Sequence, residues 1–256
     1  LYYWYFLLVL ASAASLHRLY KLYFAPKNYV VTATKKETHA VKTIYLTPLG
    51  GKVMDYKPGQ FAFVRFFSNG LPREEHHFTL SSAPDDKDIS FTIKDSGDYT
   101  SQVGKIKKGD KARVDGPYGV FSNHGLSGPF LFIAGGIGIT PVISMLKNMD
   151  KKTRDTVLIY ANREPKDMAF KTELSRLAAK KLIKLVLVFS QKKGTVKEAY
   201  QAYIDAEIID KEVADIKTRK IFLVGPVPMM DSVEKDLLAL GVQKSNIFTE
   251  RFALKD

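Results

Sequence analysis

The chain has 256 residues, enough for one large domain or two ordinary ones, and its 45% hydrophobic and 26% charged residues are typical of a folded globular protein. It contains no cysteine, which excludes disulfides, thiolate metal sites, iron–sulfur clusters and cysteine nucleophiles, so redox chemistry would need a bound cofactor. The net charge of +12 suits phosphate-rich ligands or an anionic membrane, whereas nucleic acid is disfavoured because the lysines occur as scattered pairs.

The chain opens with an uncharged apolar run, LYYWYFLLVLASAASL over residues 1–16, which His17, Arg18 and Lys21 follow at once. A membrane span needs ~20 apolar residues, and basic residues mark its cytoplasmic end. We therefore predict that residues 1–24 are the end of a transmembrane helix that begins further upstream and contacts membrane lipid. The chain would lie at the cell membrane, with the remainder facing the cytoplasm. The alternative is an ordinary buried helix.

Short β-type runs separated by turn signals follow, and they predict an antiparallel barrel over residues 25–124. The runs cover residues 29–34, 41–47, 61–66, 78–81, 89–94 and 111–115. A turn-rich linker, SNHGLSGP at 122–129, leads into alternating strands and helices, which predict a doubly wound parallel sheet over residues 125–256. Its strands are expected at 130–134, 156–161, 183–190, 220–224 and 247–250, and its helices at 141–148, 168–180 and 229–240. Residues 192–218 are polar and carry no clear pattern.

A glycine-rich turn, AGGIGITP at 134–141, joins the first strand and helix of this second domain. Its glycines allow a tight turn close to a ligand, and the helix that follows directs free N–H groups to the same place, where a pyrophosphate would fit. Pro141 stands where the GxGxxG fingerprint has its third glycine, so the pattern departs from that fingerprint. We predict phosphate binding, with a purely structural turn as the alternative.

Residues after the next strands favour NADPH over NADH. The second strand ends in Asn162 and Arg163, and a guanidinium suits a 2′-phosphate where NAD-specific domains have an acid. Ser190, Lys192 and Lys193 follow the third strand and could add to this contact, or could be solvated surface groups. The predicted NAD(P)H-binding residues are Gly135, Gly136, Ile137, Gly138, Thr140, Pro141, Asn162, Arg163, Ser190, Lys192, Gly225, Pro226 and Met229.

The barrel sequence EHHFTLSSAP at 75–84 has the residue types of a flavin site. Phe78 can stack on the ring, Thr79 can hydrogen-bond near N5, and His76 can meet the ribityl or phosphate region. Downstream, Gly97 and Thr100 stand at the start of a short helix whose N-terminus would receive the FAD pyrophosphate.

In this order the segments resemble the ferredoxin–NADP reductase superfamily, and more narrowly its NADPH oxidase and ferric reductase branch, with bacterial NADPH oxidases among the candidates. The resemblance covers essentially the whole chain and rests on KPGQ at 57–60, HHFTLSSAP at 76–84, GDYT at 97–100, DGPYG at 115–119, GGIGITP at 135–141, GP at 225–226 and ERF at 250–252. It implies that FAD is bound by His76, His77, Phe78, Thr79, Leu80, Ile93, Lys94, Gly97, Tyr99, Thr100 and Phe252. It also implies that Thr79, Glu250 and Phe252 are catalytic.

Two departures from the family pattern matter. His77 stands where the family usually has proline, and Val224 stands where it often has a cysteine beside the nicotinamide. Hydride transfer would then depend on positioning, with the nicotinamide C4 within ~3.5 Å of flavin N5. By resemblance, Phe252 stacks on the flavin face opposite Phe78 and gates nicotinamide access.

The resemblance further implies a haem-binding transmembrane domain upstream in the same protein and dioxygen as the final acceptor, reduced to superoxide. The cofactors would be FAD, NADPH or NADH, and haem in that upstream part, with no metal site in this chain. A ferric-chelate reductase is the near alternative because it would share every motif. A soluble flavin reductase and a non-enzymatic flavoprotein sensor are more distant alternatives.

Overall fold

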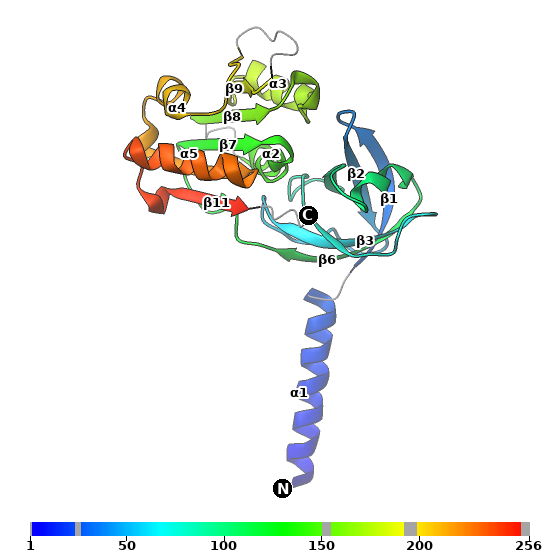
Figure 1. Ribbon diagram of the computed structural model, residues 1–256. Helices are drawn as coiled ribbons and strands as arrows, with labels where there is room; N and C mark the ends of the chain where they lie inside the picture. The colour runs from blue at the N-terminus through cyan, green and yellow to red at the C-terminus, as the bar shows by residue number, and fades with distance from the viewer. Residues whose placement is uncertain (1, 24–26, 150–154, 192–198, 252–256) are drawn as a thin grey trace.

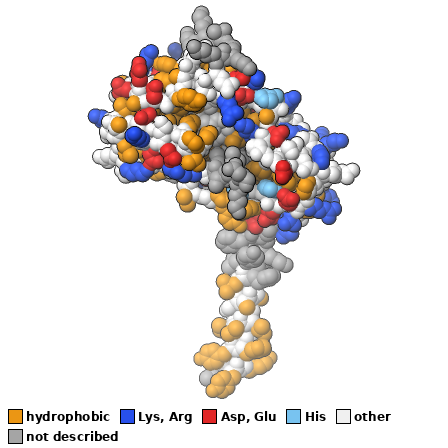
Figure 2. Space-filling view, viewed as in Figure 1, with side chains coloured by type: hydrophobic (Ala, Val, Ile, Leu, Met, Phe, Trp, Pro, Cys, Tyr) orange, Lys and Arg blue, Asp and Glu red, His pale blue; other side chains and the backbone are white. Residues whose placement is uncertain are grey.

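A computed structural model describes residues 2–23, 27–149, 155–191 and 199–251 as an N-terminal helix and two domains (Figure 1). The helix is α1 (Tyr2–Tyr23), which stands apart from the two domains in this view. From Tyr2 to Leu16 its side chains are exposed and include many large apolar groups (Figure 2), with Tyr2 90% and Trp4 71% exposed.

The expected transmembrane helix is not supported, because none of the helices among the described residues is long and apolar enough to cross a bilayer. The physical reason lies in the composition of α1. Its uncharged part is followed by His17, Arg18 and Lys21, which lower the mean apolarity of the helix. That part also begins with Tyr2, Tyr3, Trp4 and Tyr5, whose rings carry polar groups. The predicted location at the cell membrane, with this portion facing the cytoplasm, is therefore corrected.

The first domain is a six-stranded antiparallel sheet in the order β4-β3-β6-β1-β2-β5. An isolated bridge between Leu80 and Phe91 joins the ends of that order, so the sheet closes into the predicted barrel. Alternate side chains fill its interior, as Ala62, Val64 and Phe66 of β3 do. The strands are β1 (Lys27–Lys36), β2 (Val41–Pro48), β3 (Phe61–Phe67), β4 (His76–Thr79), β5 (Ile89–Lys94) and β6 (Lys111–Tyr118).

The second domain is a five-stranded parallel sheet in the order β11-β10-β7-β8-β9. Its strands are buried on both faces, under two hydrophobic clusters that contain the helices. The strands are β7 (Phe130–Gly135), β8 (Thr156–Asn162), β9 (Lys184–Phe189), β10 (Lys220–Gly225) and β11 (Ile247–Arg251). The helices are α2 (Ile139–Asn148), α3 (Lys171–Ala179), α4 (Ala206–Glu212) and α5 (Val227–Ala239). The order of the strands reverses between β7 and β10, which is the switch point where doubly wound sheets bind ligands.

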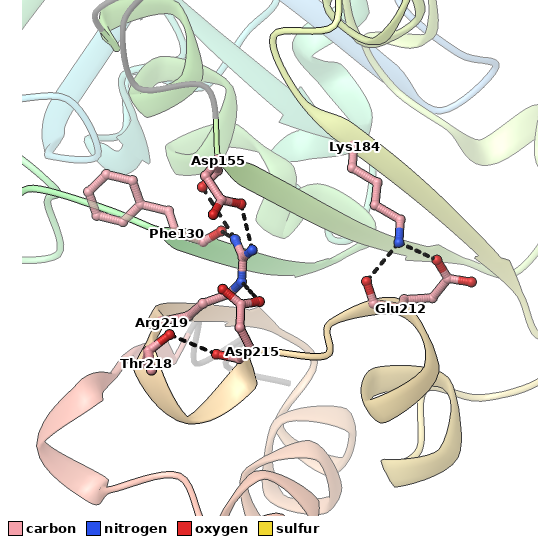
Figure 3. A network of polar contacts seen from close by, with 7 residues as sticks. All are labelled: Phe130, Asp155, Lys184, Glu212, Asp215, Thr218 and Arg219. Carbon is pink, nitrogen blue, oxygen red and sulfur yellow. Dashed lines mark hydrogen bonds and ion pairs between the residues drawn. The ribbon is translucent and has the colours of Figure 1, made fainter.

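Arg219 ties together the amino ends of three strands of this sheet (Figure 3). Its side chain is only 6% exposed, and it donates to both Asp155 and Asp215 as well as to the carbonyl oxygen of Phe130 at 3.0 Å. A polar cavity of about 490 Å³ borders this network. This cavity is not the candidate site. The guanidinium of Arg219 is already paired with two carboxylates, and doubly wound sheets bind their ligands at the opposite, carboxyl edge.

Candidate functional site

The glycine turn lies at the carboxyl end of β7, directly at the switch point. Different physical constraints require glycine at the different positions of this turn. A Cβ atom at Gly138 would lie 2.8 Å from the carbonyl oxygen of Val224, and one at Gly135 would lie 2.7 Å from Met229 Sδ. These two positions are therefore fixed by packing against β10 and α5 rather than by a ligand.

Gly136 is the position that leaves room for a ligand. Its φ of +53° favours glycine, and an added Cβ would meet no atom within 4 Å. The turn is held from below by Tyr160, whose hydroxyl donates to the carbonyl oxygen of Gly136 at 3.1 Å. Tyr160 is fully buried, and burial raises the pKa of its hydroxyl. An open backbone concavity ahead of α2 fits a phosphate group.

Sequence reasoning missed Tyr160. The available signal was a tyrosine within the aliphatic run of a central strand, TVLIYAN, since a buried tyrosine hydroxyl needs a hydrogen-bond partner. The second predicted turn, at Gly225 and Pro226, meets the glycine turn directly. A Cβ on Gly225, whose φ is +156°, would lie 3.0 Å from the Cα of Gly135.

The predicted 2′-phosphate residues also come together. The amide of Ser190 donates to the carbonyl oxygen of Asn162 at 3.1 Å, and that of Gln191 donates to Arg163 at 2.9 Å. Arg163 is exposed at this edge. The acidic neighbour Glu164 is engaged elsewhere, because it caps the following 3₁₀ turn and pairs with Lys166 at 2.8 Å. Lys192 and Lys193 lie outside the described residues.

On the barrel, the predicted FAD residues divide between the two faces of β4. His76 and Phe78 pair with Val64 and Ala62 on the side that faces the barrel core. The His76 ring stacks on Tyr99 with centroids 3.8 Å apart, and the Phe78 ring lies 6.3 Å from His76. Thr100 follows Tyr99 at the start of the 3₁₀ helix η1 (Thr100–Lys105), so the predicted pyrophosphate segment adjoins the stacked rings.

His77 does not join this group. It points to the opposite face, where its ring lies 5.7 Å from Phe61 and 5.8 Å from Phe63. Ile93 is buried in the barrel core, so only its backbone could reach a cofactor, whereas Lys94 is exposed. The Leu80 side chain is likewise buried, and its amide donates to the carbonyl oxygen of Gln60 at 3.0 Å.

Of the three predicted catalytic residues, the structure describes Thr79 on the barrel and Glu250 on the parallel sheet. Thr79 is buried and pairs with Phe61 in the barrel. The Phe61 ring would lie 3.1 Å from a Cβ atom at Gly119, and Glu250 Oε1 would lie 3.8 Å from the same atom. Glu250 of β11 therefore lies next to Gly119, which follows the barrel strand β6 and also lies against the Phe61 ring of β3. Phe252, the third predicted residue, lies outside the described residues.

Glu250 is the site's unusual ionisable group. Its Oε2 atom is buried and has no hydrogen-bond partner among the described residues. Burial raises the pKa of its carboxyl from 4.5 to about 7. An orphaned buried oxygen at a domain boundary is the kind of group that a bound coenzyme can satisfy.

Together, the barrel with its aromatic and hydroxyl strand and the switch-point cradle define a flavin- and nicotinamide-binding reductase. Comparison with protein families agrees: an FAD-binding domain matches residues 30–122, and an oxidoreductase NAD-binding domain matches residues 132–235. The chain belongs to the ferredoxin–NADP reductase superfamily, and it transfers electrons from NAD(P)H to FAD.

Individual relatives agree with this assignment. The chain is 30% identical to flavohemoprotein B of Dictyostelium discoideum, over 88% of this chain and 59% of the relative. It is 33% identical to the ferredoxin reductase component of 3-ketosteroid-9-alpha-monooxygenase from Rhodococcus rhodochrous, over 77% of this chain and 56% of the relative. It thus spans less than two thirds of either. The FAD/NAD-binding domain of nitric oxide dioxygenase from Vibrio cholerae superposes with a TM-score of 0.80 at 25% identity, covering 89% of this chain and 99% of that one.

These relatives correct the narrower resemblance. They are flavohemoproteins and reductase components, and they do not single out the NADPH oxidase branch. The motifs quoted from the sequence are those of the whole superfamily, since each serves flavin or nicotinamide binding. The haem that was expected upstream belongs to the flavohemoprotein relatives' other domain and is not shown for this chain.

Proposed function

We propose that this chain accepts hydride from NADPH, and less readily from NADH, and passes the electrons singly to a haem or iron–sulfur protein or domain. FAD, when bound, accepts two electrons as hydride and releases them one at a time. The observation that carries the proposal is that the open turn at Gly136 and the half-buried Glu250, with its unpaired Oε2, both lie at the carboxyl edge of the parallel sheet, where Glu250 also meets Gly119 of the barrel.

The roles of the chain's own residues follow from their positions. The backbone around Gly136 and the N-terminal turn of α2 would bind the pyrophosphate of the coenzyme. Arg163, exposed beside Ser190, would bind the 2′-phosphate, since Glu164 is occupied by its cap and by Lys166. Phe78 and Tyr99 would contact the FAD, and Thr79 would form a hydrogen bond to the flavin ring.

The Glu250 carboxyl would be about half protonated at neutral pH. With a pKa raised to about 7, this group can donate a hydrogen bond through Oε2 or release a proton without a large free-energy change. The approach of Glu250 Oε1 to Gly119 supports a role for this proton at the boundary between the two domains. Phe252, two residues further, is proposed as the gate to the nicotinamide subsite.

The choice of a metal-centre acceptor follows the relatives, whose names describe flavohemoproteins and a ferredoxin reductase component. Direct reduction of dioxygen to superoxide, or of ferric chelates, has no comparable support. Anaerobic mixing of the FAD-loaded chain with NADPH should bleach the flavin. Subsequent cytochrome c reduction should be insensitive to superoxide dismutase. Absence of bleaching with both coenzymes would refute the hydride step, and dismutase-sensitive reduction would favour dioxygen as the acceptor.

A further inference from the structure

Helix α2, which begins at the glycine turn, is buried on every side. All residues from Ile139 to Leu146 are buried, including Thr140 and Ser144. A helix that is buried all round lies between two layers. One layer is the parallel sheet, with Phe132 and Ala134 of β7 in the same hydrophobic cluster as α2, and the other is the barrel.

Ser144 makes the most direct contact between α2 and the barrel. Its side chain is completely buried, and its Oγ donates to the carbonyl oxygen of Ser82 at 2.6 Å. Helical serines often donate a hydrogen bond to a carbonyl of their own helix, whereas the Ser144 hydroxyl donates to a carbonyl of the other domain. Ser82 is itself fixed, because its Oγ lies 2.7 Å from the Tyr56 hydroxyl and accepts from the amide of Ser90 at 2.9 Å.

Neighbouring contacts of α2 reach the same barrel segment. Lys147 Nζ approaches the carbonyl oxygen of Ser81 at 3.5 Å. Met145 packs so closely on Gly59 that a Cβ there would lie 2.5 Å from Met145 Cε. Gly59 precedes Gln60, whose carbonyl oxygen accepts from the amide of Leu80. A single turn of α2, from Ser144 to Lys147, therefore contacts the barrel at Ser81 and Ser82, directly after Thr79, and at Gly59.

The other end of α2 carries the nicotinamide side of the site. Gly138 is its N-cap residue, and Gly136 stands just before it. A short α-helix is a rigid rod, so the spacing between its N-terminus and Ser144 is constant. The anchoring of Ser144 on Ser82 therefore fixes where the glycine turn lies relative to the flavin strand.

We propose that Ser144 is a positioning residue for hydride transfer: its hydrogen bond to Ser82 sets the separation between the coenzyme-binding turn and the flavin-binding strand. This inference rests on the proposed function. Without the bond, the Ser82 carbonyl loses its partner on α2 and the helix can shift along the barrel. A misplacement of about 1 Å can lower a reaction rate by about 100-fold, while binding through the intact turn is kept.

The test compares FAD-loaded wild type with Ser144→Ala, Ser144→Thr and, as a matched control, Ser175→Ala, which removes an exposed serine of α3. Anaerobic stopped-flow mixing gives the limiting rate of flavin reduction and the Kd for the coenzyme. Coenzyme deuterated at the transferred position shows, by its isotope effect, that the measured step is hydride transfer. The Ser144→Ala variant should lose about tenfold or more in limiting rate with less than about twofold change in Kd.

The Ser144→Thr variant, which keeps the hydroxyl, should recover most of the rate, and Ser175→Ala should match wild type. An unchanged limiting rate in Ser144→Ala would overturn the proposal, as would an equal loss in Ser144→Thr. If Ser144→Ala does not retain FAD, Ser144→Cys replaces it, since a thiol is similar in size but a weak donor. A wild-type rate in Ser144→Cys would overturn the proposal too. Failure of the proposed function would look different, because wild type itself would show no reduction.

Discussion

Replacing Glu250 with glutamine should make the protein more stable at neutral pH, although the exchange removes a predicted catalytic group. Burial raises the pKa of this carboxyl from 4.5 to about 7 in the folded protein. Between these pH values the native state keeps the proton, whereas the unfolded chain has released it. Stability therefore falls as pH rises through this window and is constant above it.

The size of the effect follows from the two pKa values. Each unit between them corresponds to 1.36 kcal/mol, so the full penalty above pH 7 is about 3 kcal/mol. This figure is an upper bound, because glutamine leaves the same buried position with an amide to satisfy. For a chain of this size the penalty amounts to a difference in Tm of about 5 °C or more at pH 8.

The measurement is thermal unfolding of the FAD-loaded, coenzyme-free protein from pH 5 to pH 8. Glu250→Gln should exceed the Tm of wild type only slightly at pH 5, by an amount that grows toward pH 7 and then stays constant to pH 8. The exposed Asp85→Asn in a barrel loop serves as the control for removing one negative charge, and its difference from wild type should not grow between pH 5 and pH 8. A Glu250→Gln difference that stays constant across this range would refute the buried, protonated carboxyl.

Three further substitutions test other parts of the structure. Arg163→Ala should raise KM for NADPH about tenfold and leave that for NADH nearly unchanged, because only NADPH carries the 2′-phosphate; equal changes in steady-state assays would contradict this. Gly136→Ala should lower the free energy of unfolding by about 1–2 kcal/mol because of the positive φ at this position, and it should weaken coenzyme binding. Denaturant unfolding and coenzyme titration measure the two effects. The control Gly104→Ala, at a position without a positive φ, should change neither quantity. Arg219→Met should cost about 3 kcal/mol in denaturant unfolding without changing the rate of flavin reduction, and a loss below about 0.5 kcal/mol would show that the amino-edge network is dispensable.

The architecture could be predicted because the strands of both sheets have recognisable patterns in the local sequence. Short β-type runs between turn signals such as KPG at 57–59 identify the barrel strands, and unbroken apolar runs such as that of β7, followed by helical segments, identify buried parallel strands. β4 was predicted at 78–81 and lies at 76–79, because paired histidines do not look like strand residues. The missed helix α4 had a signal in Asp205, whose side chain accepts from the amide of Ile208 as an N-cap.

The membrane prediction failed for a physical reason that a count of charges does not capture. The run at the start of α1 is free of charge, but its tyrosines and the basic residues after Leu16 lower the mean apolarity of the helix. Absence of charge within a run indicates a buried or interfacial helix as readily as a span. Mean apolarity over ~20 residues is the property that a bilayer requires.

Sequence patterns could not reveal the contacts between the two domains. Periodicity reports which face of an element is buried, but not what buries it. Ser144 is a single hydroxyl inside an otherwise apolar helix, and nothing in the spacing of α2 indicates that its partner is 62 residues away in the barrel. Glu250 likewise lies in an ordinary strand, and the burial that raises the pKa of its carboxyl is visible only in the folded protein, where Gly119 of the other domain lies beside it. Hydride transfer between two cofactors depends on this boundary, so its rate should depend most on residues whose role is visible only in the folded protein.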